Sequence, residues 1–358
     1  MPARTFRLYV GTYTLPMSFV KGQGMGIYTC SFDSENGTLQ KITETAADNP
    51  SYLALHPSGL FLYAVHEISE AKQPTFDAIS AYAVDAETGA LRLLNRQPCL
   101  GGSPCHVAVD PSRRWVYVAA CAGGDVAAYP LGEDGRLGAY TAHITHVQEG
   151  KVAHAHSITP SPSGEYALAC DLGLDCVFVY RLDRLSGGLI PHQELALSTG
   201  SGPRHLDFHP GGNFVYVINE LDATLSVLGW EPVGGRLEVL QTITTLPAGF
   251  SGRGWCADVH VHPNGRFVYG SNRGDSSLVI YRVEQGSGKL SLVGFESTRG
   301  KTPRSFVLDP QGKWLLAANQ DSGDVAVFRI DRRSGRLAYR GCIEIPSPVC
   351  LKLGQRSG

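Results

Sequence analysis

Two short stretches, Asn36-Gly37-Thr38-Leu39 and Ser334-Gly335-Arg336-Leu337, begin and end the pattern that decides the fold. A glycine in a polar turn, usually with leucine two residues later, occurs at Gly37, Gly89, Gly135, Gly188, Gly235, Gly288 and Gly335. The intervals between these glycines are 52, 46, 53, 47, 53 and 47 residues. A period of about 50 residues with β-type sequence in every repeat is typical of a β-propeller, in which each repeat forms a four-stranded blade. The sequence therefore predicts an all-β fold with seven blades.

Six prolines give a second, independent mark between the glycines. Each lies in a turn of the form His/Asp/Ser-Pro-x-Gly, with Arg113 once in place of glycine, at Pro57, Pro111, Pro162, Pro210, Pro263 and Pro310. Apolar runs on both sides of each turn predict a hairpin. Six hairpins leave one of seven blades without its first strand. Pro348-Val349-Cys350-Leu351-Lys352-Leu353 resembles an innermost strand, so we expect it to pair beside Leu8-Tyr9-Val10 and close the ring, which removes exposed sheet edges.

Composition limits the class of protein. The 358 residues include 42 Gly and 21 Pro with 43% hydrophobic residues, which fits one propeller domain over residues 1–358 better than two domains. A net charge of −2 gives no basic footprint for nucleic acid, and no run of residues is long enough to cross a membrane. Nine cysteines without a C-x-x-C pair and no signal segment indicate reduced thiols in the cytoplasm. We expect a monomer or a weak homo-oligomer.

Two positions around each turn proline should meet at one end of the hairpin. Six residues before the proline stand Ser51, Cys105, His156, Arg204, Ala257 and Arg304, and ten after it stand Glu67, Cys121, Leu172, Glu220, Arg273 and Gln320. Long insertions at 14–25, 67–77, 141–154 and 246–255 fall on the same end, where binding sites are usually built. Innermost strands line the channel, so we expect convergence there of His156, Arg204, Glu220, Arg273 and Arg304. Three guanidiniums, a carboxylate and an imidazole suit an anionic substrate and acid–base chemistry.

Other polar residues near the turn prolines have structural interpretations. Histidines stand immediately before three of these prolines, at His56, His209 and His262. We interpret them as turn-stabilising groups, since such side chains favour the turn itself. Asparagines stand nine residues after three of the prolines, at Asn219, Asn272 and Asn319. A tie between blades is the preferred interpretation of these asparagines, and substrate contact by Asn219 and Asn272 is the functional alternative.

Two further interpretations stay open from the residues alone. His106 and His205 lie five residues before their prolines, where alternation places them on the strand face opposite Cys105 and Arg204. Packing and substrate binding explain these two histidines equally well. For Arg204 and Glu220 the alternative to catalysis is a structural ion pair, because buried pairs are not by themselves evidence of chemistry.

Several motifs occur in the order found in a known family: Ala153-His154-Ala155-His156-Ser157, Gly202-Pro203-Arg204-His205, Val217-Ile218-Asn219-Glu220-Leu221, Trp255-Cys256-Ala257-Asp258-Val259-His260, Ser271-Asn272-Arg273-Gly274 and Thr302-Pro303-Arg304-Ser305-Phe306. Over essentially the whole chain they resemble the seven-bladed propeller lactonases, which include propeller-type 6-phosphogluconolactonases and fungal carboxy-muconate lactonizing enzymes. The resemblance implies catalytic roles for His156, Arg204, Glu220 and Arg273. It leaves the substrate open, because both activities share the scaffold.

A lactone hydrolase fits these residues. Ring opening needs a nucleophilic water, stabilisation of the carbonyl oxygen and a proton for the leaving alkoxide. Glu220 or His156 can accept the proton of the water, and the other can supply one to the leaving oxygen. Arg204 or Arg273 can face the oxyanion, which leaves Arg304 for a phosphate or carboxylate of the substrate. Further substrate contacts are expected at the channel mouth from His106, His205, Asn219, Asn272, Gln320 and Glu67.

We expect no cofactor and no metal, since neither G-x-S-x-G nor H-E-x-x-H occurs in the chain. Calcium held by a ring of Asn and Asp is the alternative. Two other functions remain possible. One is cyclisation of carboxy-cis,cis-muconate to a lactone with the same acid and arginines, and the other is a platform for protein interaction. Hydrolysis of a sugar lactone is preferred, with a phosphorylated lactone such as 6-phosphogluconolactone as the expected substrate, because a platform needs no internal acid, base and guanidinium set.

Overall fold

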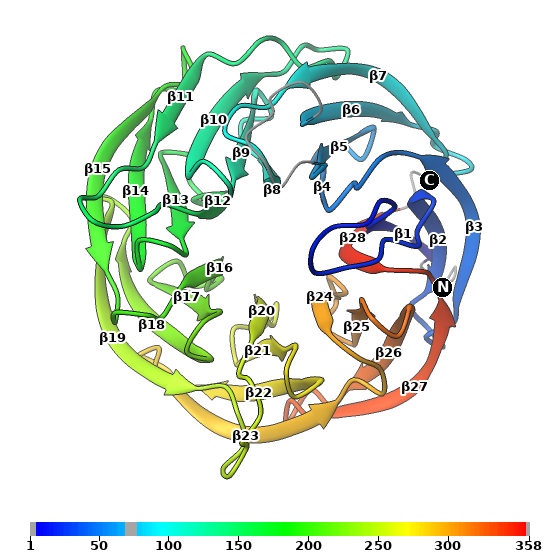
Figure 1. Cartoon of the computed structure of the whole chain (residues 1–358). Helices are drawn as coiled ribbons and strands as arrows, with labels where there is room; N and C mark the ends of the chain where they lie inside the picture. Colours follow the sequence, from blue (N-terminus) through cyan, green and yellow to red (C-terminus); the bar gives the residue numbers. More distant parts are fainter. Residues whose placement is uncertain (1–4, 69–76, 356–358) are drawn as a thin grey trace.

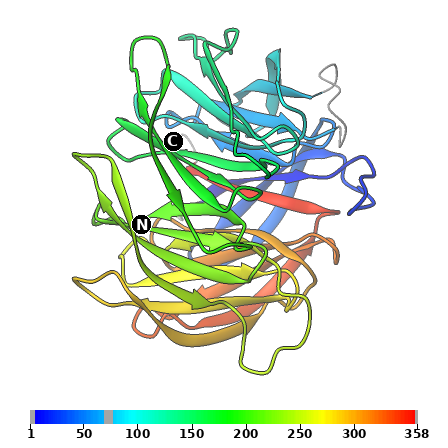
Figure 2. The same cartoon turned by 60° about the vertical axis from the view of Figure 1, so that its left-hand side comes forward.

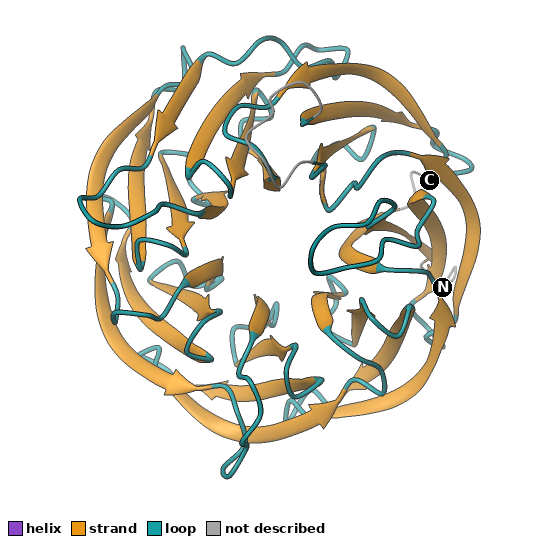
Figure 3. Cartoon of the chain, viewed as in Figure 1, coloured by secondary structure: helices purple, strands orange, loops and turns teal. Residues whose placement is uncertain are grey.

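The computed structural model describes residues 5–68 and 77–355 as seven four-stranded antiparallel sheets around a central axis (Figure 1). Within these two ranges every regular element is a strand, and there is no helix that could cross a membrane (Figure 3). Successive sheets pack against one another around the ring (Figure 2). The seven-bladed β-propeller predicted from the repeat is confirmed.

Each blade runs from an innermost strand at the axis to an outer strand at the rim. The innermost strands are β28 (Pro348–Gln355), β4 (Tyr52–Leu55), β8 (Pro104–Val109), β12 (Ala155–Pro160), β16 (Pro203–Phe208), β20 (Cys256–Val261) and β24 (Pro303–Leu308). The second strands are β1 (Thr5–Thr12), β5 (Phe61–His66), β9 (Trp115–Ala120), β13 (Tyr166–Asp171), β17 (Phe214–Asn219), β21 (Phe267–Asn272) and β25 (Trp314–Asn319). The third strands are β2 (Gly26–Asp33), β6 (Ala78–Val84), β10 (Asp125–Pro130), β14 (Cys176–Leu182), β18 (Thr224–Glu231), β22 (Ser277–Val283) and β26 (Asp324–Ile330). The outer strands are β3 (Leu39–Ala46), β7 (Leu91–Pro98), β11 (Ala142–Thr145), β15 (Leu189–Ala196), β19 (Arg236–Thr244), β23 (Leu290–Ser297) and β27 (Leu337–Glu344).

The turn prolines lie between the innermost and second strands, as predicted. In the blade of β16 and β17, Phe208 pairs with Val215 on either side of the turn. Within the turns, His209 Nδ1 accepts the backbone N–H of Gly211 at 2.9 Å, and His262 Nδ1 accepts that of Asn264 at 3.1 Å. His56 accepts the N–H of Ser58 in the same way, at 3.2 Å. These histidines stabilise the turns.

The ring is closed by the two ends of the chain. Strand β28 pairs antiparallel with β1, with Leu353 opposite Leu8 and Lys352 opposite Tyr9, as expected from the sequence. The resulting blade packs its apolar face against β25 and β26 of the neighbouring blade, where Val10, Tyr28 and Leu316 are buried together. Closure therefore covers a sheet edge and completes the hydrophobic contact between blades.

The repeated glycines mark contacts between neighbouring blades. Gly335, at φ +77°, lies so close to the ring of Phe267 that a Cβ would stand 2.5 Å from it. In the fourth repeat this role belongs to Gly187, which has φ +71° and meets the ring of Trp115, and not to Gly188 as the sequence pattern indicated. A left-handed backbone and an aromatic neighbour both exclude a side chain at these turns.

One of the four expected insertions is redefined by the structure, and a second cannot be compared with it. The segment 141–154 contains the outer strand β11, so the connection to β12 comprises only residues 146–154. Period counting could not separate this short strand from the loop that follows it. Most of the insertion 67–77 lies outside the described residues. The connections between β1 and β2 and between β19 and β20 are long, as expected.

Candidate active site

A β-bulge occurs at the site position of five innermost strands. Pairing with the second strand shifts register at Cys105, His156, Arg204 and Arg304, and between Cys256 and Val259. A bulge leaves the extra residue unpaired and changes the direction of its side chain. The expectation that His205 lies on the strand face opposite Arg204 is therefore wrong, because Arg204 Nη1 stands 3.2 Å from His205 Nε2.

The second site position is fixed by a backbone hydrogen bond. The N–H of Glu220 donates to the carbonyl of Gly202 at 2.7 Å, and the N–H of Gln320 donates to that of Thr302 at 2.9 Å. Both acceptor residues have a left-handed backbone, with φ of 62° and 59°. The hydrogen bond places the residue ten after the turn proline beside the bulged residue of the same blade. Local geometry thus brings the two site positions of each hairpin together.

Glu220 joins residues of two blades into one buried cluster. Its Oε2 lies 2.8 Å from Arg204 Nε and 2.7 Å from Arg273 Nη2, and its Oε1 accepts the indole N–H of Trp255 at 2.9 Å. The guanidinium of Arg273 also stacks on the Trp255 ring, 4.4 Å from its centroid. Burial alone would raise the pKa of Glu220, but Arg273 and Arg204 outweigh it and lower the pKa to about 2. The carboxylate is therefore ionised, and both of its oxygens are engaged by positive or N–H groups.

Arg304 and Glu67 meet through a tyrosine. The hydroxyl of Tyr13 donates to Glu67 Oε2 at 2.7 Å and accepts from Arg304 Nη2 at 3.1 Å. Arg304 also lies over the rings of Tyr13 and Phe19, 5.4 Å from each centroid. Gln320 is buried nearby in the ring and bonds Asp321 through its amide N–H. Two residues expected to bind substrate, Glu67 and Arg304, thus share one hydrogen-bond chain.

His156 stands beside this cluster with an imidazole nitrogen unused. Its ring centroid lies 5.3 Å from that of His205, and its buried Nδ1 has no hydrogen-bond partner in the described part of the chain. Burial, and after it Arg204, lowers the pKa of His156 well below its usual value. The ring is neutral at pH 7 and can form a hydrogen bond with a bound molecule.

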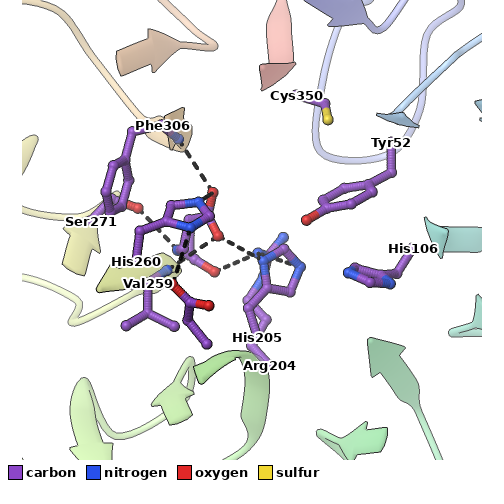
Figure 4. A network of polar contacts seen from close by, with 12 residues as sticks. Tyr52, His106, Arg204, His205, Val259, His260, Ser271, Phe306 and Cys350 are labelled. Atoms are coloured by element: carbon purple, nitrogen blue, oxygen red, sulfur yellow. Dashed lines mark hydrogen bonds and ion pairs between the residues drawn. The ribbon is translucent and has the colours of Figure 1, made fainter. Parts of the chain in front are cut away.

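His106 and His205 belong to the same axial group of side chains (Figure 4). His205 Nδ1 lies 3.0 Å from Asp258 Oδ1, and burial together with Arg204 lowers the pKa of His205 to about 4. The neutral ring donates from Nδ1 to Asp258 and presents Nε2 to Arg204. Tyr52 of β4 and His106 of β8 approach His205 across the axis, and each ring centroid lies 5.5 Å from that of His205. His205 therefore contacts Arg204 directly, and His106 contacts the ring of His205.

The asparagines have structural partners. Asn219 Nδ2 donates to the hydroxyls of Thr224 and Ser226 within its own blade, at 2.8 and 3.0 Å. Asn272 Nδ2 donates to the carbonyl of Thr245, in the connection from the preceding blade, at 2.7 Å. None of these hydrogen bonds involves a guanidinium of the cluster. Asn319 Nδ2 likewise donates to the carbonyl of Thr298, in the connection from the blade before it, at 3.3 Å. Asn272 and Asn319 thus link two blades, and Asn219 bonds only within its own blade.

The sequence analysis did not predict site roles for three residues of the cluster: Tyr13, Phe19 and Trp255. Tyr13 and Phe19 come from the connection between β1 and β2, and Trp255 comes from the connection before β20. The available signal was an aromatic residue in a long connection on the site end of the ring. Among the described residues, no group of three or more His, Cys, Asp or Glu side chains is placed to hold a metal ion.

The fold and the axial cluster together define a seven-bladed propeller with a buried polar centre of arginines, carboxylates and histidines. A family model described as "Lactonase, 7-bladed beta-propeller" matches residues 7–353. This chain belongs to that lactonase family.

Relatives of known name agree with this assignment. A 6-phosphogluconolactonase of Bacillus subtilis is 34% identical over 307 residues, covering 84% of each chain. Among solved structures, a periplasmic gluconolactonase of Pseudomonas aeruginosa has a TM-score of 0.90 and 33% identity, covering 99% of this chain and 100% of that one. A putative 6-phosphogluconolactonase of Bacteroides uniformis has a TM-score of 0.89 and 34% identity, covering 98% of this chain and 99% of that one.

Proposed function

We propose that this protein hydrolyses a sugar lactone, and that its preferred substrate is a 6-phosphogluconolactone. The observation that carries the proposal is the cluster in which Glu220 holds Arg204 and Arg273 at 2.8 and 2.7 Å. Two buried guanidiniums fixed by one carboxylate form a rigid site for a developing negative charge. The names of the relatives support the sugar lactone as the substrate class.

The residues divide the work of ring opening as follows. The substrate carbonyl oxygen lies against Arg204 and Arg273, which stabilise the oxyanion formed when water attacks the carbonyl carbon. His156, neutral and with Nδ1 unpartnered among the described residues, forms a hydrogen bond to the attacking water. Glu220 holds the guanidiniums in place, because its oxygens are already taken by Arg204, Arg273 and Trp255.

The anionic group of the substrate is assigned to Arg304. This guanidinium bonds the neutral hydroxyl of Tyr13 and has no carboxylate within ion-pair distance in the described ranges. It therefore keeps charge available for a phosphate, which planar guanidiniums bind through two hydrogen bonds. Gln320 and His106 complete the proposed contacts around the sugar.

A turnover screen tests this assignment directly. The wild-type protein is incubated with 6-phosphogluconolactone, gluconolactone and carboxy-cis,cis-muconate, and spontaneous rates are subtracted. We expect turnover of the lactones, with a higher kcat/KM for the phosphorylated one. Consumption of carboxy-cis,cis-muconate without lactone hydrolysis would replace the hydrolase by a cyclase, and no turnover of any of the three would end the proposal.

We also propose metal-independent catalysis by a cytoplasmic protein. The groups assigned above supply charge stabilisation and hydrogen bonding without a metal, so activity should survive EDTA followed by dialysis. Loss of activity that calcium restores would contradict this. Cell fractionation tests the cytoplasmic location. The test is needed because one structural relative is named a periplasmic gluconolactonase.

A further inference from the structure

Two buried glutamates occupy the same repeat position on different blades, Glu67 after β5 and Glu220 after β17. These blades lie far apart around the axis (Figure 1). Glu220 forms ion pairs with two guanidiniums and accepts an indole N–H, and its low pKa leaves it unable to take a proton near neutral pH. A carboxylate with this environment positions its neighbours and is a poor proton acceptor.

The surroundings of Glu67 are different. Glu67 is only 6% exposed, and the hydroxyl of Tyr13 donates to its Oε2 at 2.7 Å. The side chain of Ser51 also faces the carboxylate and, like Tyr13, acts to lower its pKa. No described guanidinium lies within ion-pair distance of it. Burial raises the pKa of Glu67, and Arg304 offsets only part of that effect. The other titratable or charged groups that face Glu67 are Tyr13, Cys105, Cys121, Arg204 and Arg304.

The main chain and Tyr13 hold Glu67 in one orientation. Its N–H donates to the carbonyl of Asn49 at 3.1 Å, and its own carbonyl accepts from Asn49 Nδ2 at 2.9 Å. On the side chain, Tyr13 occupies Oε2, while no protein donor in the described ranges bonds Oε1. Tyr13 remains a hydroxyl, because burial raises its pKa well above the usual value. Among the described residues, one carboxylate oxygen is thus anchored by Tyr13, and the other forms no hydrogen bond, with the small side chain of Ser51 facing the group.

We propose that Glu67, and not Glu220, is the proton-transferring carboxylate of the reaction. This inference rests on the proposed lactone hydrolysis. Glu67 Oε1 accepts a proton from the attacking water as the water oxygen bonds to the carbonyl carbon. When the bond between this carbon and the ring oxygen breaks, the protonated Glu67 returns that proton to the leaving alkoxide. The new carboxylic acid then loses its own proton to solvent, so atoms and charge balance.

Paired carboxylates with opposite environments are a recurrent device for acid–base chemistry. A group whose pKa is raised toward the working pH both accepts and returns a proton efficiently. Among the two buried glutamates only Glu67 meets this condition, and it also stands next to the guanidinium assigned to the substrate anion through Tyr13. The same repeat position therefore has different roles in the two blades: Glu220 holds the guanidiniums in place, and Glu67 transfers the proton.

The test compares Glu67→Gln with the exposed control Glu165→Gln, using 6-phosphogluconolactone from pH 5 to 9. We expect Glu67→Gln to lower kcat by ~10²–10⁴ while KM stays within a few-fold. Binding of 6-phosphogluconate, measured by calorimetry, should change less than about threefold, because the carboxyl transfers a proton and does not hold the phosphate. Glu67→Asp should restore part of kcat.

The pH profile separates Glu67 from a neighbouring thiol. Cys121 also titrates within the pH range of the test, because a hydrogen bond from Cys105, followed by His154, lowers its pKa to about 6. The acid limb of kcat/KM should persist in Cys121→Ser and disappear in Glu67→Gln. A folded Glu67→Gln variant with wild-type kcat, or with the acid limb intact, would overturn the inference. Failure of the proposed function looks different, because the wild-type protein itself would then turn over no lactone.

Discussion

The blade that closes the ring and its neighbour, β24–β27, build the same local geometry in two ways. In both, a residue with left-handed backbone precedes a proline, Ser347 at φ 47° and Thr302 at φ 59°. The carbonyl of Ser347 accepts the N–H of Tyr13 at 3.1 Å, as that of Thr302 accepts the N–H of Gln320 at 2.9 Å. One pair belongs to a continuous hairpin, and the other comes from opposite ends of the chain. Strand pairing, and not the connecting turn, therefore sets the position of a site residue.

The largest effect is expected from removing the strand that only the closing blade takes from the far end of the chain. Deletion of residues 346–358 strips β28 from β1 and exposes strand edges on both sides of the gap. We expect an insoluble or strongly destabilised product, measured by soluble yield and thermal melting. A truncated protein that melts like the intact one would show that closure contributes nothing.

The next largest effect is expected from removing a charge that only one of the two blades carries at its innermost strand. Arg304 occupies the bulged position of β24, whereas the closing blade has the buried Val349 after its left-handed residue and proline. Loss of a charge-assisted hydrogen bond is worth about 1.5–3 kcal/mol, so Arg304→Ala should raise KM for 6-phosphogluconolactone by about 10- to 150-fold. The rise should be much smaller for gluconolactone. Equal effects on both substrates would remove Arg304 from phosphate recognition.

Much of this geometry was predictable and some was not. Counting from the turn prolines found Arg204, Glu220 and Arg273, because each hairpin repeats one register. The same counting could not reach Tyr13, since the closing blade has no turn proline between its innermost and second strands. The bulge at Arg204 was also missed, although a proline directly precedes the bulged residue in three of the five strands. Both oxygens of Glu220 are engaged through contacts with residues of two blades and with Trp255, and a single repeat of the sequence cannot show these contacts.

A smaller effect is expected from substitutions at Tyr13 and Gln320, which occupy matching positions in the two blades. These substitutions test whether the two side chains also have the same role in the reaction. Tyr13→Phe removes the hydroxyl that joins Arg304 to Glu67, so we expect kcat to fall by roughly tenfold, which corresponds to ~1.4 kcal/mol, about the net value of one hydrogen bond. Gln320→Met, which keeps size at the matching position, should cost less. Steady-state kinetics on both variants decide the matter. Equal losses would mean that packing at this position, and not the hydroxyl, is what counts.

The smallest effect is expected when the closing blade is made continuous. Phe6 pairs with Gln355, so a short Gly/Ser linker can join the two ends. New ends can be opened in the exposed turn between β18 and β19, around residues 232–234. This circular permutant should fold, melt within a few degrees of the parent and keep its kcat within about twofold, since no site contact changes. A soluble permutant without activity would show that connectivity matters for the site after all.

The three guanidiniums of the axial cluster also affect what happens after the ring has opened. Arg204, Arg273 and Arg304 face two carboxylates, Glu67 and Glu220, so the protein groups of this centre carry an excess of positive charge. A lactone gains one negative charge when it becomes an open acid, and buried charges of opposite sign attract strongly. The product should therefore bind more tightly than the substrate. We expect competitive inhibition by 6-phosphogluconate with an inhibition constant below KM, weakening as salt is added, and an inhibition constant above KM would contradict this.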